Sequence, residues 1–244
     1  MRRTVAILLS LTLAFGLTAC GTGTPNTTTQ PNVPASGAED TAPTTTPSAS
    51  ESAPSSTTGS GKTLVVYFSM PETTDPNNMT EEEENSAVVI DGKVLGNTQY
   101  VAMLIQEALG ANLYRIEPET PYPTDHEVLV DQASEEQSAA TRPAIKEKVE
   151  NIADYDTIFL GYPNWWGDMP MILYTFLEEY DLSGKTIVPF NTHGGSGFSN
   201  TISTIAELQP DATVVQDGFT VSRNNVADAK EDVLAWLSDN GYQQ

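Results

Sequence analysis

The sequence predicts an α/β fold, with a doubly wound, five-stranded parallel sheet covered by helices on both faces. The first observation is a set of short runs rich in β-branched and aromatic residues, typical of buried parallel strands. The second is that stretches with apolar residues at helical spacing follow these runs, and this alternation repeats five times along residues 62–244. A parallel sheet with right-handed crossovers is the simplest arrangement of such a series.

The elements follow in order along the chain. The expected strands are residues 63–68, 112–116, 156–161, 186–190 and 212–215, with a continuation near 218–221. The expected helices are residues 97–109, 126–151, 170–180, 200–208 and 226–240. Asn97 is a good first residue and Gly110 a good terminator for the first helix. The last helix is expected to bury Ala229, Val233, Leu234, Trp236 and Leu237.

The N-terminal residues have the pattern of an export signal. Arg2 and Arg3 precede the apolar residues 5–19, a length that suits a signal peptide and is short for a membrane-spanning helix. Leu-Thr-Ala-Cys-Gly at residues 17–21 resembles a bacterial lipobox, and Cys20 is the only cysteine. We expect a signal peptide over residues 1–19 and lipidation of Cys20. Ordinary signal cleavage beside an incidental cysteine is the alternative.

Composition divides the remaining chain into a linker and a folded domain. Residues 20–61 are mostly Thr, Ser, Pro and Ala, which predicts a disordered tether, and residues 62–244 form one domain. A lipidated Cys20 leaves no thiol for a disulfide or a cysteine metal site. The net charge of −22 disfavours nucleic acid and anionic lipid as partners. Membrane association is therefore expected through the lipid anchor alone, on the extracytoplasmic face.

Three polar loops follow predicted strands. Because the carboxyl ends of parallel strands meet in one crevice, these loops are expected to converge on a ligand. The first set suits a phosphate and the other two can flank a flat aromatic ring, which together indicate a flavin mononucleotide (FMN) site. The candidate cofactor-binding residues are Ser69, Asn97 and Thr98; Pro163, Asn164, Trp165, Trp166 and Gly167; and Thr192, His193, Gly194, Gly195, Ser196 and Gly197.

In the order of its elements and in these motifs, the chain resembles the flavodoxin family over essentially all of residues 62–244. The resemblance implies bound FMN and one- or two-electron chemistry. It also implies that Ser69, Asn97 and Thr98 hold the phosphate with hydroxyls and backbone amides at a helix N-terminus. Asn97 is equally suited to cap that helix without any ligand.

The other two loops are expected to enclose the flavin ring. Trp165 and Trp166 are the candidates for stacking on it, with core packing as the alternative. The glycines of residues 194–197 allow close backbone approach to the opposite side. His193 either donates to a flavin carbonyl or serves as an ordinary hydrogen-bonded loop residue. His126, the only other histidine, is assigned no role.

The chain departs from the family in an insert, residues 70–95, between Ser69 and Gly96. The insert contains four consecutive glutamates, residues 81–84, and a predicted hairpin over residues 88–94 with its turn at Asp91-Gly92. If the hairpin folds back on itself, Ser69 and Gly96 meet and complete the phosphate site. Calcium binding by this acidic segment is disfavoured, because residues 75–79, Asp-Pro-Asn-Asn-Met, lack the glycine and the ligand spacing of a calcium loop. The segment suits a solvated flap, a docking surface or a lid.

These inferences lead to an exported, lipid-anchored, FMN-binding electron-transfer protein, with a redox protein or a small molecule as its partner. The negative charge is expected to lower the flavin potential. An NAD(P)H-dependent quinone or small-molecule oxidoreductase is the alternative, disfavoured by export because nicotinamide cofactors are scarce outside the cytoplasm. A flavin-free binding module is the third possibility. No metal cluster is visible in the sequence.

Overall fold

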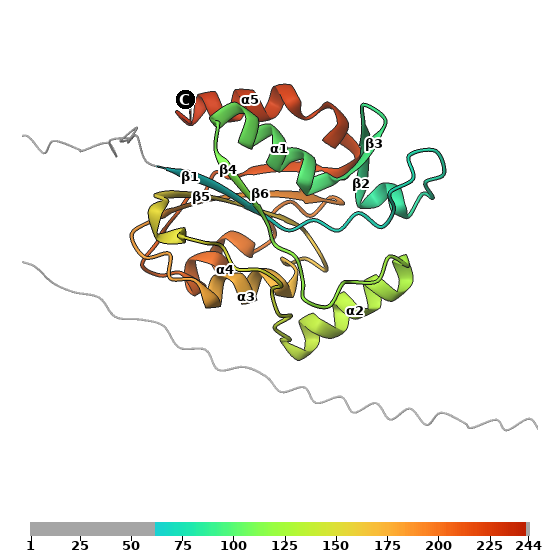
Figure 1. Ribbon diagram of the computed structural model, residues 1–244, viewed down its shortest axis with the longest axis horizontal. Coiled ribbons are helices and arrows are strands. Elements are labelled where there is room, and N and C mark those ends of the chain that lie inside the picture. The colour runs from blue at the N-terminus through green and yellow to red at the C-terminus, as the bar shows by residue number, and fades with distance from the viewer. Residues whose placement is uncertain (1–61, 243–244) are drawn as a thin grey trace, which may run out of the picture. The chain divides into compact units, whose positions relative to one another are not determined.

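The computed structural model describes residues 62–242, in which six strands form a parallel sheet. The sheet has the order β4-β1-β5-β6-β7, with β8 also paired to β6 (Figure 1). This arrangement confirms the doubly wound fold. The strands are β1 (Thr63–Tyr67), β4 (Asn112–Arg115), β5 (Thr157–Pro163), β6 (Thr186–His193), β7 (Thr213–Val214) and β8 (Phe219–Ser222).

The predicted fifth strand is divided into two segments, so the expected count of five strands is wrong by one. β7 pairs with β6 at Thr186 and Ile187, and β8 pairs with it from Phe190 to His193. Pro189 lies in the gap between these pairings and has no amide hydrogen for a ladder. A Cβ at Gly218 would lie 2.3 Å from the Pro189 carbonyl oxygen, so the chain crosses close to β6 here.

Helices cover both faces of the sheet (Figure 1). α1 (Asn97–Leu109) and α5 (Lys230–Asp239) lie on one face, and α3 (Met171–Glu179) and α4 (Thr201–Leu208) lie on the other. Successive residues of β1 point to opposite faces, so Leu64 and Val66 join one apolar core and Val65 and Tyr67 the other. The predicted strands are therefore rich in buried β-branched residues because the sheet contacts an apolar core on each of its faces.

α2 (His126–Ala139) is shorter than the predicted helix over residues 126–151. Ala140 adopts a left-handed conformation, with a φ of 49°, and ends the helix. Pro143 disfavours helical geometry at the residue before it, which prevents resumption. Residues 144–146 instead run antiparallel beside residues 117–119, with Lys146 N–H donating to the Glu117 carbonyl at 2.9 Å. The short 3₁₀ helix η2 (Ile152–Asp154) follows.

The C-terminal helix also differs from the prediction. It begins as the 3₁₀ helix η3 (Arg223–Asp228) before α5. Ala229, Val233 and Leu237 are buried as expected, and Trp236 is partly buried. The expected burial of Leu234 is wrong, because its side chain is 41% exposed. Helical periodicity turns this position outward beside the buried Val233.

The insert after β1 folds back as a hairpin. β2 (Ala87–Ile90) and β3 (Lys93–Gly96) pair antiparallel, and η1 (Glu83–Asn85) precedes them. Asp91 and Gly92 have φ values of 50° and 74°, as a type I′ turn requires. The predicted hairpin is thus confirmed, and its second strand leads directly into α1.

The expected signal peptide, the lipidated Cys20 and the linker lie outside the described residues. Within residues 62–242, no helix combines the length and apolarity needed to cross a membrane.

Candidate functional site

The first polar loop closes because Gly96 lies against Ser69. A Cβ at residue 96 would lie 2.1 Å from the Ser69 hydroxyl oxygen and 3.2 Å from Pro71 Cδ. Both residues are buried, although 26 residues of insert separate them along the chain. The hairpin therefore returns the chain to the point where it left the sheet, and Ser69 meets the start of α1.

The N-terminus of α1 supplies the next groups. Asn97 N–H donates to the Ser86 carbonyl at 3.0 Å, and Asn97 Nδ2 donates to the Asn85 carbonyl at 3.0 Å. Gln99 Oε1 accepts from Gly96 N–H at 3.1 Å. The amides of Thr98 and Gln99 belong to the first turn, which no helix can pair internally. Among the described residues, the buried Asn97 Oδ1 has no hydrogen-bond donor.

Thr98 and Thr192 connect this helix to the third polar loop. Their hydroxyl oxygens are 2.8 Å apart, and both residues are buried. Thr192 and His193 belong to β6, which is three residues longer than predicted because its end pairs with β5 and β8. The predicted loop over residues 192–197 therefore begins on the sheet.

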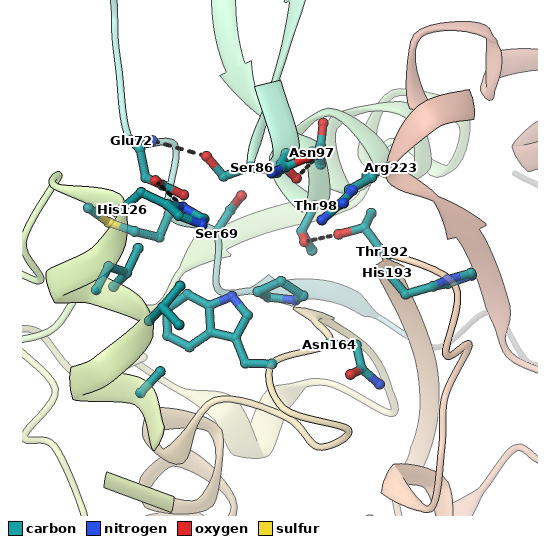
Figure 2. Close-up of a pocket in the computed structure, with 18 of the residues that line it drawn as sticks. Ser69, Glu72, Ser86, Asn97, Thr98, His126, Asn164, Thr192, His193 and Arg223 are labelled. Carbon is teal, nitrogen blue, oxygen red and sulfur yellow. Dashed lines mark hydrogen bonds and ion pairs between the residues drawn. The ribbon is translucent and has the colours of Figure 1, made fainter. Parts of the chain in front are cut away.

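Arg223 enters the site from the residue after β8. Its side chain points toward Thr98 and Thr192 (Figure 2), and its Nη1 would lie 3.2 Å from a Cβ at Gly194. Within the described part of the chain, no carboxylate forms an ion pair with Arg223. This arginine places a permanent positive charge beside the first turn of α1.

The tryptophan turn is held by Asn164. Its N–H donates to the Thr192 carbonyl at 2.8 Å, and its Oδ1 accepts from Gly167 N–H at 3.1 Å. Its Nδ2 donates to the Gly197 carbonyl at 3.0 Å. Asn164 therefore connects the second polar loop to the third by hydrogen bonds. Gly167 and Gly197, which supply its partners, lie in the turns of these two loops.

The two tryptophans lie in different environments. Trp165 meets Phe68 and Tyr122 edge to face, with ring centroids 5.5 and 5.7 Å away. Trp166 is 59% exposed and has a φ of 54°. Its Nε1 donates to the Val130 carbonyl of α2 at 3.1 Å. Trp165 is thus a rigid wall of the site, whereas Trp166 fastens the turn to α2.

His193 has a defined hydrogen-bonding state. Its Nδ1 accepts from Gly195 N–H at 2.8 Å, so in the neutral ring the proton is on Nε2. Burial lowers the pKa of His193, because a charged imidazolium is less well solvated there. A neutral ring with an Nε2–H donor is therefore favoured at pH 7.

These groups surround one cavity of about 430 Å³. Ten of the predicted residues line it: Ser69, Asn97, Thr98, Pro163, Asn164, Trp165, Trp166, Thr192, His193 and Gly194. Four predicted residues do not line it: Gly167, Gly195, Ser196 and Gly197. These four shape the loops instead, and Ser196 accepts from Ser199 N–H through its carbonyl.

Sequence reasoning missed three charged or titratable residues that line the cavity, namely Glu72, His126 and Arg223. Arg223 follows the carboxyl end of a strand, so the rule that found the other loops applied to it as well. Glu72 and His126 follow no strand of the sheet. The inference that His126 has no role in the site is not supported, because the fold brings its ring to the cavity wall.

No group of three potential metal-ligating His, Cys, Asp or Glu side chains occurs among residues 62–242. The glutamates of residues 81–84 are largely exposed, and Glu83 binds back to Thr80 N–H at 2.7 Å.

Comparison with known proteins shows that the chain belongs to the flavodoxin family. The flavodoxin family model matches residues 86–240. A candidate flavoprotein from Bacteroides eggerthii has 32% sequence identity and a TM-score of 0.55 over 74% of this chain and 98% of its own. One from Bacteroides uniformis has 31% identity and a TM-score of 0.56 over 73% and 98%.

A flavoprotein in complex with FMN from Lactobacillus acidophilus has 20% identity and a TM-score of 0.48, over 70% of this chain and 99% of its own. The comparison with curated proteins finds no match. Family membership supports FMN as the cofactor.

Proposed function

We propose that this protein binds FMN and transfers electrons, and that a lipid on Cys20 holds it at the outer face of the cell membrane. The observation that carries the proposal is the convergence of Ser69, the first turn of α1 and Arg223 at one end of the cavity. Aromatic side chains and glycine-rich backbone form the other walls of the same cavity. A phosphate end and a planar end in one cavity suit FMN.

The phosphate end offers hydroxyls, free amides and a cation. The Ser69 hydroxyl is a donor, and so is one of the Thr98 and Thr192 hydroxyls, since the hydrogen bond between these two uses the hydrogen of the other. The first-turn amides add to the positive end of the helix dipole. Arg223 adds a guanidinium, whose planar fork suits phosphate oxygens. The unpaired Asn97 Oδ1 is an acceptor, which suits a hydroxyl of the ribityl chain. These residues fit FMN better than a flavin without phosphate.

The planar end offers an aromatic wall and a stretch of backbone that can approach the flavin ring closely. Trp165 is fixed edge to face by its neighbours, so its orientation costs little entropy on binding. His193 lines the cavity from the third polar loop and carries an Nε2–H in its neutral ring. When bound, FMN supplies reversible transfer of one or two electrons. The residues that line the cavity would bind the phosphate and orient the ring.

Absorption spectroscopy of the purified full-length protein, followed by mass analysis of any released chromophore, tests the cofactor. Stoichiometric FMN is the expected result. A colourless protein that takes up no added FMN would overturn the proposal.

The electron-transfer role predicts a reduction potential below that of free FMN. The net charge of −22 disfavours added negative charge on the reduced ring. A redox titration that gives a potential above that of free FMN would contradict this part of the proposal.

The sequence supports the membrane anchor through the Leu-Thr-Ala-Cys-Gly motif at residues 17–21. Metabolic labelling with a fatty acid analogue tests it, with Cys20→Ala as the control variant. Label on the parent protein and none on the variant is expected. Equal labelling of both would exclude Cys20 as the lipid site.

A further inference from the structure

The cavity has a second side that the expected FMN residues do not form. It is lined by the insert and by α2, and we call it the α2 compartment, consisting of Met70, Glu72, His126, Leu129, Val130 and Ala133. Leu129 and Ala133 are buried, so its wall on α2 is apolar. His126, at the first turn of the helix, is partly exposed and is the polar group that α2 contributes.

Glu72 and His126 form the polar pair of this compartment. Glu72 Oε2 lies 2.8 Å from His126 Nδ1, and the side chains are 4% and 29% exposed. Figure 2 shows the pair on the Ser69 side of the cavity, across from His193. Of the seven acidic residues in the insert, Glu72 alone is buried. A buried carboxylate is costly unless it is paired, so this contact has a specific structural role.

The insert holds Glu72 in position through its backbone. Glu72 N–H donates to Ser86 Oγ at 3.2 Å, and Ser86 Oγ donates to the Glu83 carbonyl at 3.2 Å. At the other side, Asp125 caps α2 by accepting from Val128 N–H at 3.1 Å. Both members of the pair therefore come from anchored backbone.

This contact determines which nitrogen of His126 is available to a ligand. An ionised carboxylate only accepts hydrogen bonds, so Nδ1 carries a proton and donates to Glu72. Nε2 is then a lone pair in the neutral ring and an N–H in the charged ring. It can accept from a hydroxyl or donate to a carbonyl oxygen.

We propose that the α2 compartment binds a quinone or its quinol, with His126 Nε2 hydrogen-bonded to the ring oxygen and Glu72 as the positioning residue. A quinone oxygen is an acceptor and a quinol oxygen is a donor, and Nε2 serves both. The apolar wall of Leu129 and Ala133 suits the rest of a neutral, planar ring.

The charge around the compartment disfavours a nicotinamide dinucleotide as the occupant. Exposed acidic residues, including Asp75, Glu81, Glu82 and Glu84, belong to the same insert. They repel a pyrophosphate and leave a neutral compound unaffected. The inference therefore rests on the proposed flavin function and names its electron acceptor or donor as a small organic molecule.

Nuclear magnetic resonance of the full-length, FMN-loaded protein provides the test, because the chain has only two histidines. Duroquinone is the probe, since its fully substituted ring does not readily add to nucleophilic side chains. We expect duroquinone to shift the ring ¹⁵N signals of His126 and to leave those of His193 nearly unchanged. A titration without any shift at His126 would overturn the inference.

Variants distinguish a role of Glu72 in positioning His126 from a general role in the stability of the fold. We expect Glu72→Ala to redistribute the His126 tautomers and to weaken duroquinone binding up to about tenfold, because binding must then immobilise a His126 ring that Glu72 no longer holds. Glu72→Gln retains an acceptor for Nδ1–H and should retain most of the affinity. Glu84→Ala, an exposed carboxylate of the same insert, is the matched control.

FMN affinity is measured for every variant. If Glu72→Ala and His126→Gln bind FMN normally and bind duroquinone with unchanged affinity, the inference is wrong while the proposed function stands. A parent protein that binds no FMN would overturn the proposed function, and with it the inference. Tighter binding of NADH than of duroquinone would assign the compartment to a nicotinamide and contradict the inference.

Discussion

Gly96 lies so close to Ser69 that any side chain at residue 96 would place its Cβ 2.1 Å from the Ser69 hydroxyl oxygen. This contact is where the insert closes and where the strand-end serine of β1 joins the helix start. The insert therefore lengthens the loop without dismantling the phosphate end of the cavity.

Gly96→Ala should weaken FMN binding at least tenfold and lower the free energy of unfolding by about 1–3 kcal/mol, as overpacking does. The added methyl group forces Ser69 and α1 apart. Fluorescence titration with FMN and urea unfolding measure the two effects.

The double variant Ser69→Ala with Gly96→Ala is the control, since it removes the closest atom. It should recover part of the lost stability and little of the FMN affinity. If Gly96→Ala binds FMN as well as the parent, the contact between residues 69 and 96 does not shape the phosphate site.

Arg223→Ala should weaken FMN binding by about 10- to 100-fold, because hydrogen bonds to charged groups contribute about 1.5–3 kcal/mol. Binding of riboflavin, which has no phosphate, should be unchanged. Isothermal calorimetry with both ligands measures the difference.

Lys230→Ala removes an exposed positive charge from α5 and is the matched control for the change in net charge. Equal losses of FMN and riboflavin affinity in Arg223→Ala would mean that the guanidinium acts on the ring or on the fold. It would then not be a phosphate ligand.

The two tryptophans should respond differently to substitution. Trp165→Ala removes a wall that packs against Phe68 and Tyr122, so we expect loss of both FMN affinity and stability. Trp166→Phe removes the indole hydrogen bond to Val130 and keeps an aromatic ring at a largely exposed position, so we expect a stability loss of about 1 kcal/mol. Thermal unfolding with and without FMN measures both. A larger loss of FMN affinity in Trp166→Phe would reverse this assignment.

His193 should make stability depend on pH. Burial lowers its pKa in the folded state, so the unfolded chain binds more protons as the pH falls. Stability from the neutral ring is therefore complete above the ordinary histidine pKa of about 6.5 and declines as the pH falls through and below that value.

His193→Asn tests this sign, because Asn Oδ1 can still accept from Gly195 N–H while the side chain no longer titrates. Urea unfolding between pH 5 and 8 should show a smaller loss of stability at low pH in the variant than in the parent. Identical profiles would show that the His193 ring is as well solvated in the folded state as in the unfolded chain.

Much of the candidate site was predictable because the relevant physics is local. Ser69, Thr98, Asn164 and Thr192 are close to the carboxyl ends of strands or to a helix start, and strand periodicity locates both. The Asp91-Gly92 turn has a sequence signature that depends on only two residues.

Errors arose where tertiary contacts set the limits of elements. The polar stretch after His126 has weak periodicity, and Pro143 with the contact to residues 117–119 ended the helix early. The last strand divided because of the neighbouring Pro189, which lies on another element.

The local pattern of residues by itself determined the order of strands and helices, the hairpin, and the polar loops of a flavodoxin-family protein. Only the tertiary structure decided that Glu72 and His126, 54 residues apart, form a pair beside that site. It also decided that Arg223 faces Thr98 and that Trp165, rather than Trp166, is held as a wall. Periodicity depends on neighbouring residues, whereas these contacts depend on how distant segments pack.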